Sequence, residues 1–319
     1  ERARTVEGSA MAIKGITNSE GGGASFGRSA VALATSEGFY GTYAGTTQNI
    51  GVAVLAGEGT GMERDYDYTS ARYSTDLRKP EDIGKRAGEK AIARLNPRQV
   101  SSQKVPVVFD KDSASGLIGH FAGAISGASI ARGVSFLKDK MGAEIFAPGI
   151  DIIDDPHRVR GLRSKPFDGE GVRNTKQSLI ENGVLQCWLL DTASARQLGL
   201  TSNGHAARGT GGPPSPSTTN LYMAPGKISH DQLMGDISQG LYVTELMGFG
   251  VNGVTGDYSR GAAGFWIENG KIAYPVSGVT IAGNLIDMFR NLTPANDLEF
   301  RHGTNSPTVR VEGMTLAGA

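Results

Sequence analysis

The tripeptide Glu-Asn-Gly occurs twice, and both copies lie between runs of β-type residues, in SLIENGVLQCWLL (178–190) and in FWIENGKIAYPV (265–276). An Asn-Gly pair in this setting is the strongest short-range signal for a β-hairpin with a two-residue turn. We therefore predict a hairpin at each of these places. The 46 glycines among 319 residues also favour turns, β-structure and close backbone contacts over a helical bundle.

The chain before residue 98 combines strand and helix patterns. The segments VALATSEGFYGTYAG (31–45) and IGVAVLAGEGTG (50–61) predict strands, because β-type residues flank turn residues in both. PEDIGKRAGEKAIARLNP (80–97) predicts a helix, since proline opens it, acidic residues follow in the first turn and Asn-Pro closes it. The polar stretch 98–104 then predicts a linker.

The residues after this linker predict a glycine-rich helix. VPVVFD (105–110) has the pattern of a short buried strand, and GLIGHFAGAISGASIARG (116–133) follows as a helix with Asp112 or Ser113 as its N-cap. Three glycines recur at every fourth position, which predicts a buried face against which another backbone packs closely: Gly119, Gly123 and Gly127.

Together these patterns predict an α+β fold in two domains. We expect the remainder of an N-terminal α+β domain, a sheet plus a helix, over residues 1–98. We expect a larger, mostly antiparallel β-rich domain over residues 105–319, with the buried glycine-rich helix inside it. SHDQLMGDISQG (229–240) predicts one more short helix, because Ser229 and Gln232 have the spacing of a capping box.

Charge and cysteine usage narrow the function classes. Lys plus Arg and Asp plus Glu both number 32, without a basic run, so direct nucleic-acid binding is not expected. Cys187 is the single cysteine, which excludes an intrachain disulfide. With no apolar leader in the opening residues and no convincing membrane span, we expect a cytoplasmic protein without membrane contact. The missing initiator Met suggests a fragment, a processed chain or residues missing upstream.

His120 lies on the glycine-rich helix and is the first residue to test as a metal ligand. A zinc helix of the H-E-x-x-H type needs a second histidine one turn further on and a glutamate beside the first. Those two positions hold Ala124 and Phe121. A histidine hydrogen-bonded inside the fold is therefore favoured over a zinc ligand.

Three short motif matches lack the context that their chemistry requires. GFGVNG (248–253) has the spacing of a dinucleotide-binding loop, but strand and turn residues follow it where a helix is needed. GASFG (23–27) matches a nucleophile elbow but precedes a strand pattern. DYDY (65–68) lacks the glycine and the distal glutamate of a calcium loop.

The remaining chemically active side chains show no catalytic spacing. Cys187 is expected mid-strand as a buried structural residue, on the same face as Leu185 and Leu189. His157 and His302 have charged neighbours but no ligand spacing. Spacing alone therefore identifies no complete catalytic constellation.

Long stretches of the chain resemble the TldD/PmbA family, also called modulators of DNA gyrase. The resemblance covers nearly the whole chain and rests on these sequence segments: MERDYDYTSARYSTDL (62–77), GLIGHFAGAISGAS (116–129), PFDGEGVRN (166–174), WLLDTASARQLGLTSNGHA (188–206), TELMGFGVNGVTGDYSRGAAGFWIENGKIAYPVSGVTIAGNL (244–285) and NDLEFR (296–301).

The resemblance implies a cytoplasmic, heteromeric, zinc-dependent protease built from two branches. The TldD branch carries H-E-x-x-x-H on the glycine-rich helix and a cysteine ligand near its C-terminus, and the PmbA/TldE branch lacks them. In this chain His120 remains, Phe121 replaces the glutamate, Ile125 replaces the second histidine, and no cysteine follows residue 296. The chain thus resembles the PmbA/TldE branch, with no catalytic residue, no metal ligand set and no cofactor of its own. Zinc is expected in a TldD-type catalytic paralogue.

The long segment HAARGTGGPPSPSTTNLYM (205–223) predicts a loop that is either functional or disordered. Its segment TTNLYM (218–223) resembles a stretch near the active site of the catalytic branch, so Thr219, Asn220 and Tyr222 are candidates for the wall of a peptide channel. A mobile surface loop is an equal alternative.

Three function classes follow. The first is a non-catalytic subunit of a peptidase for unfolded peptides or small proteins, inactive alone and able to form a homodimer. The second is a regulatory protein-binding module of the gyrase-modulator type without proteolysis. The third is an independent hydrolase.

Overall fold

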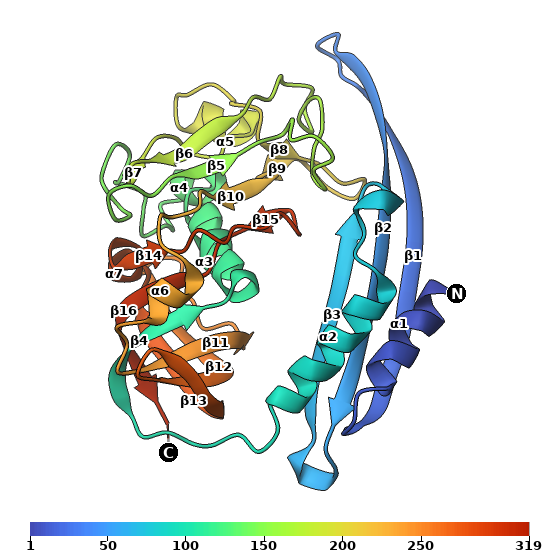
Figure 1. Ribbon diagram of the computed structural model, residues 1–319. Helices are drawn as coiled ribbons and strands as arrows, with labels where there is room; N and C mark the ends of the chain where they lie inside the picture. Colours follow the sequence, from blue (N-terminus) through green and yellow to red (C-terminus); the bar gives the residue numbers. More distant parts are fainter. Residues whose placement is uncertain (319) are drawn as a thin grey trace. The chain divides into compact units, whose positions relative to one another are not determined.

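The computed structural model describes residues 1–318 (Figure 1). Residue 319, the last of the predicted C-terminal domain, lies outside the described residues. The chain forms two compact units, each described here by itself. Unit 1 comprises residues 1–31, 44–98 and 160–162, and unit 2 comprises residues 32–43, 99–159 and the chain from 163 onward.

Unit 1 is a three-stranded antiparallel sheet with two helices packed on one face (Figure 1). Its elements are α1 (Arg2–Met11), most of β1 (Ile16–Ala34) and of β2 (Tyr40–Ala56), the 3-10 turns Gly59–Gly61 and Ser74–Asp76, β3 (Glu63–Ala71) and α2 (Pro80–Ala93). Alternate residues of β2 enter its core, which is the period expected for a strand with one buried face: Ile50, Val52, Val54 and Ala56. The sequence prediction missed α1, and the GASFG segment, which was expected to precede a strand, lies within β1.

The two aspartates of the DYDY segment lie on β3 and form ion pairs with helix α2 and with the residues just before it. The Asp65 carboxylate forms an ion pair with the Lys90 ammonium at 2.6 Å, and the Asp67 carboxylate forms one with the Arg78 guanidinium at 2.8 Å. Both carboxylates are buried and therefore need these partners. These ion pairs give both carboxylates a structural role in the fold.

Unit 2 contains a six-stranded sheet in the order β13-β12-β11-β4-β16-β14. All neighbours are antiparallel except β11 and β4, and an additional pairing between β13 and β16 closes five of the strands into a ring. The strands are β4 (Gln103–Phe109), β11 (Gln239–Met247), β12 (Asp257–Glu268), β13 (Lys271–Asn284), β14 (Leu292–Pro294) and β16 (Val309–Ala317).

A second sheet in unit 2 has the order β15-β10-β5-β6-β7, and β8 pairs with β9 separately. Their bounds are β5 (Ile152–Asp154), β6 (Gln177–Glu181), β7 (Val184–Leu185), β8 (Ala206–Ala207), β9 (Ser215–Pro216), β10 (Leu221–Met223) and β15 (Thr304–Asn305). The helices of unit 2 are α3 (Lys111–Ala124), α4 (Gly127–Ala131), α5 (Thr192–Gln197), α6 (His230–Met234) and α7 (Leu285–Arg290).

Helix α3 runs between these two sheets and contacts strands of both (Figure 1). One core cluster includes residues of the two sheets together with Leu117 and Phe121 of the helix. The mixed, sheet-rich α+β class predicted from the sequence is therefore confirmed.

Both Asn-Gly hairpins are confirmed. Asn182 and Gly183 join β6 to β7 with φ of +47° and +83°, and Asn269 and Gly270 join β12 to β13 with φ of +50° and +76°. Positive φ at both central residues is the requirement of a type I′ turn, which Asn-Gly satisfies with little strain.

The predicted helix boundaries are partly confirmed. Helix α2 begins at Pro80 as predicted and ends at Ala93, and the capping box of Ser229 and Gln232 opens α6. The N-cap of α3 is Asp110, whose carboxylate accepts from the backbone N–H of Ser113, so the predicted caps Asp112 and Ser113 are wrong.

The predicted packing of the glycine face is wrong for two of its three glycines. Gly119 and Gly123 are exposed, and a Cβ built on either would meet nothing within 4 Å. Gly127 belongs to the separate helix α4, where a Cβ would lie 2.6 Å from the Ser194 hydroxyl oxygen and 2.8 Å from the Leu189 carbonyl oxygen. The fourfold spacing does not mark one continuous face because α3 ends at Ala124. Thus α3 buries its apolar face and leaves its glycines open.

This difference predicts opposite effects of one substitution at two sites. Gly119→Ala should raise the free energy of unfolding by about 0.5–1 kcal/mol, because glycine weakens a helix interior and the space is open. Gly127→Ala should lower it by about 1–3 kcal/mol through overpacking. Equilibrium denaturation followed by circular dichroism measures both, and equal losses of stability would contradict the assignment of the open face.

Candidate functional site

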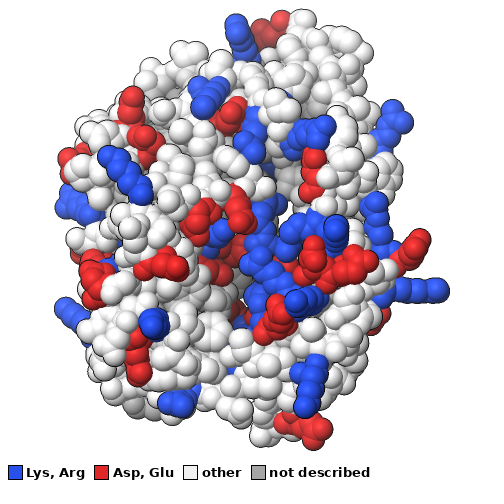
Figure 2. Space-filling model, in the orientation of Figure 1, with Lys and Arg blue, Asp and Glu red and all other residues white. Residues whose placement is uncertain are grey.

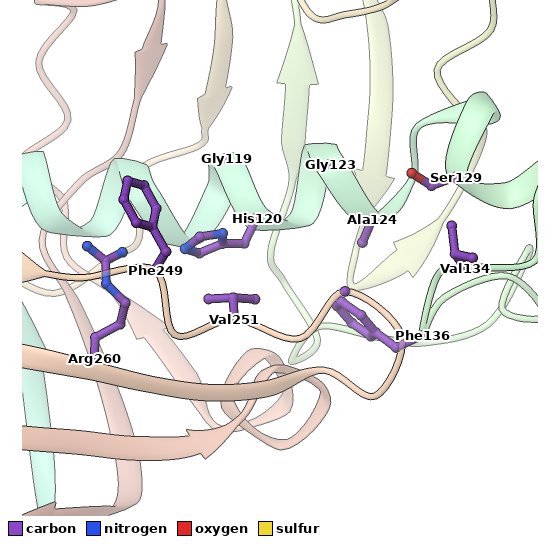
Figure 3. Close-up of a pocket in the computed structure, with 11 residues that line it drawn as sticks. Gly119, His120, Gly123, Ala124, Ser129, Val134, Phe136, Phe249, Val251 and Arg260 are labelled. Carbon is purple, nitrogen blue, oxygen red and sulfur yellow. The ribbon is translucent and has the colours of Figure 1, made fainter.

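The candidate site is a pocket of about 320 Å³ along the open face of helix α3 (Figure 3). Three further segments complete its walls: α4 with the residues that follow it, the loop between β11 and β12, and β12 itself. The lining residues are Gly119, His120, Gly123, Ala124, Ser129, Val134, Phe136, Phe249, Val251, Gly253 and Arg260. Most of them are apolar or glycine, and two carry nitrogen-bearing functional groups: His120 and Arg260.

His120 projects from α3 into this pocket (Figure 3). Its ring meets the ring of Tyr258 edge to face, with centroids 6.1 Å apart, and no hydrogen bond to it is found among the described residues 1–318. Burial lowers the pKa of His120, and the positive charge of Arg260 lowers it further. The neutral imidazole therefore offers one donor and one acceptor to the pocket. Among the described residues His120 therefore lacks the hydrogen bond inside the fold that was predicted for it.

Arg260 of β12 is half-buried at one end of the pocket, beside Phe249 (Figure 3). Its Nε–H donates to the carbonyl oxygen of Met247 on the neighbouring strand at 3.2 Å. This bond fixes the side chain and leaves both terminal amino groups of the guanidinium for another acceptor. Within residues 1–318 no carboxylate pairs with it.

The residues around His120 do not fit a zinc site. Throughout residues 1–318 there is no group of three or more His, Cys, Asp or Glu side chains that could hold a metal ion. Phe121 and Ile125 are fully buried, and the ring of Phe121 packs edge to face on Phe146 at 5.3 Å. The positions of the implied base and second ligand thus contribute to the core, while the neighbour of His120 in the pocket is the cation Arg260.

Comparison with known proteins decides the family. The model of the PmbA/TldA metallopeptidase C-terminal domain matches residues 102–318, and the model of the central domain of the same family matches residues 1–95. Metalloprotease PmbA of Escherichia coli O157:H7 is 44% identical over 317 residues, which cover 99% of this chain and 68% of that protein. The chain belongs to the PmbA/TldD family.

Two solved structures share the fold over nearly the whole chain. A Thermotoga maritima protein described as a modulator of DNA gyrase has a TM-score of 0.90 at 30% identity and matches 99% of this chain and 73% of its own. A Bacteroides thetaiotaomicron protein of the same description has a TM-score of 0.90 at 29% identity and matches 100% and 70%. The chain thus spans about two thirds of the length of its curated relatives.

The resemblance to the PmbA/TldE branch is confirmed. Against the 44% identity with the Escherichia coli PmbA protein, a TldD homologue of Buchnera aphidicola is 26% identical over 246 residues, 72% of this chain and 51% of that protein. The chain is therefore more similar to the PmbA relative than to the TldD one.

The predicted channel residues lie on and next to β10, away from the pocket lining. Both groups of Thr219 bond to the carboxylate of Asp154, the N–H at 2.7 Å and the hydroxyl at 2.8 Å. The amide of Asn220 accepts from the N–H of Arg163 at 3.0 Å and donates to the carbonyl of Asp155 at 2.7 Å. Tyr222 is half-buried and packs on Phe300.

Thr219 and Asn220 are thus buried, with their polar groups bonded inside unit 2. Their channel role stays a prediction that these contacts do not support. In the segment before them β8 pairs with β9, and residues 208–213 are exposed.

Other sequence candidates have structural partners. Cys187 lies beyond the end of β7 and not within a strand, its thiol is half-buried 3.7 Å from the Gln177 amide oxygen, and burial raises its pKa to about 11. The thiol is therefore protonated near neutral pH and is a poor nucleophile. His157 bonds to the Asn174 amide oxygen at 2.9 Å, and His302 to Asp112 at 2.9 Å.

Sequence reasoning missed two contributors to the pocket. The GFGVNG loop, rejected as a nucleotide site, supplies Phe249, Val251 and Gly253 to its wall. Arg260 has no local motif at all, since β12 and the loop bring it to α3 from far along the chain. The signal that the sequence offered was an aromatic residue within a glycine-rich turn, Phe249, whose side chain the structure leaves fully exposed.

Acidic and basic side chains are interspersed over the face shown in Figure 2, in keeping with a formal net charge of zero. Among the helices of residues 1–318, none has the length and apolar character needed to cross a membrane.

The pKa of His120 gives a test of the pocket's electrostatics. In an NMR titration, this pKa should lie below the ordinary value of 6.5, and Arg260→Gln should raise it by removing a nearby cation. The unfolded chain then binds more protons than the folded chain between the folded-state pKa and 6.5. This contribution to stability is therefore lost as the pH falls through that window. An unchanged His120 pKa in Arg260→Gln would contradict the proximity of the two side chains. The pKa values of the other histidines serve as controls.

Proposed function

We propose that this chain is a non-catalytic PmbA/TldE-type subunit of a heteromeric zinc metalloprotease that acts on unfolded peptides or small proteins. A TldD-type paralogue would supply the zinc and the catalytic base. The observation that carries the proposal is the state of helix α3, where Phe121 and Ile125 are buried in the core and His120 lacks a second ligand. The similarity to proteins named metalloprotease PmbA supports the peptidase connection.

A regulatory binding module is the second candidate. It is favoured by the description of two solved relatives as modulators of DNA gyrase. The exposed apolar residues near the pocket also suit a protein partner: Met247 ends β11, and Phe249 and Val254 lie on the loop that follows it. In this alternative the chain would bind its target without proteolysis. In the main proposal the chain works in the cytoplasm together with its paralogue.

A reconstitution assay distinguishes these functions. Cleavage of unfolded casein should be undetectable with the full chain alone and should appear when the TldD-type paralogue of the same organism is added. The control replaces the metal-binding histidines of the paralogue and should abolish cleavage without abolishing co-purification. Cleavage by the lone chain would establish an independent hydrolase. A stable pair without any peptidase activity would favour the regulatory module.

The exposed loop between β8 and β9 gives a second test. Because β8 and β9 are paired, the replacement is confined to residues 208–214, which a short Gly-Ser linker should substitute without loss of the fold. If the loop borders the shared peptide channel, peptidase activity of the reconstituted pair should fall while pairing on size-exclusion chromatography is unchanged. Full peptidase activity of the reconstituted pair with this variant would exclude a role of the loop in the peptide channel.

A further inference from the structure

We propose that the pocket along α3 binds the C-terminal end of a peptide, with the terminal carboxylate at Arg260 and an apolar side chain against Val134 and Phe136. The proposal deepens the proposed function by giving peptide ends a place on the non-catalytic subunit. It is tested on the lone chain by binding, so its outcome does not depend on peptidase activity.

The pocket has the size and lining of a ligand site. Its volume of about 320 Å³ lies at the lower end of the range of about 300–1,000 Å³ typical of ligand pockets. Such sites combine apolar walls with a few polar groups that orient the ligand. Val134, Phe136 and Val251 supply the apolar part here, and His120 and Arg260 supply the polar part.

The guanidinium of Arg260 selects for an anion. Its Nε is held by the Met247 carbonyl, and its terminal amino groups remain available at the end of the pocket marked by Phe249 (Figure 3). Arginine matches the planar geometry of a carboxylate with two parallel hydrogen bonds. Asp and Glu are missing from the lining residues, so the charge of Arg260 is not neutralised within the pocket.

His120 indicates a singly charged ligand. Burial and the nearby guanidinium lower its pKa, so the ring adds a hydrogen-bond donor without adding a second charge. A phosphate dianion in this partly apolar site would be left with one unmatched charge at a large desolvation cost. A carboxylate balances Arg260 charge for charge and accepts a further hydrogen bond from the imidazole.

The open glycines make room for an extended backbone. Added Cβ atoms at Gly119 and Gly123 would meet nothing within 4 Å, so the space directly beside these two glycines is open. The pocket continues along α3 from Arg260 toward Ser129 and Val134 (Figure 3). A carboxylate fixed at Arg260 therefore directs the last residues of a peptide along this helix.

The test measures binding of short fluorescent peptides to the full chain by anisotropy. The first probe is fluorescein-Gly-Ala-Ala-Phe with a free carboxylate, the second is its C-terminal amide, and the third is an amide peptide with an internal glutamate. We expect the free acid to bind at least tenfold more tightly than either amide. Equal binding of the acid and the simple amide, or no binding of the acid at millimolar concentration, would overturn the proposal. Binding of the glutamate peptide as tightly as the free acid would overturn the assignment to a peptide terminus.

Two variants locate the binding. Arg260→Gln should weaken binding of the free-acid peptide at least tenfold. The matched control Arg132→Gln changes an exposed arginine outside the pocket lining and should leave this binding unchanged. Gly123→Leu should fill the pocket and block binding while the thermal midpoint is retained, since the space beside Gly123 is open. If Arg260→Gln folds poorly, Gly123→Leu alone decides. Unchanged binding in the folded Gly123→Leu variant would overturn the proposal.

Discussion

The burial of one face of helix α3 between the two sheets of unit 2 is the constraint on which the rest of the site depends. Leu117 and Phe121 of this face belong to a core cluster that includes strands of both sheets. Phe121 also stacks edge to face with Phe146 and Phe289. A charged side chain at such a position would lose its hydration without a partner. Packing therefore occupies the positions that a metal site on this helix would require.

The opposite face of α3 has a different physical character because its glycines leave space that no neighbouring side chain fills. Burial and a nearby guanidinium keep His120 neutral there, and Arg260 is fixed by a backbone carbonyl. A helix that lacks a complete ligand set thus retains a cavity with directional polar groups. This combination fits the proposed non-catalytic subunit, because the ligand set on the helix is incomplete while a surface suited to binding remains. We infer that binding is what this face contributes.

Local signals in the sequence were sufficient for local structure. The Asn-Gly turns, the start of α2 and the capping box of α6 each depend on backbone preferences within a few residues. The family resemblance further identified His120, Phe121 and Ile125 as the positions to examine. The closure of β13 onto β16 and the approach of Arg260 to His120 depend on contacts between distant segments, for which no local pattern exists. The fourfold glycine spacing misled because the helix ends at Ala124, before the third glycine.

The central claim is that this chain has no zinc site of its own, and the zinc content of the chain tests it most directly. The full chain, equilibrated with zinc and dialysed, should retain far less than one zinc per molecule by mass spectrometry of the metal, because one histidine provides too few ligands for a tetrahedral site. His120→Ala should leave that content unchanged. About one zinc per chain that is lost on His120→Ala would contradict the account.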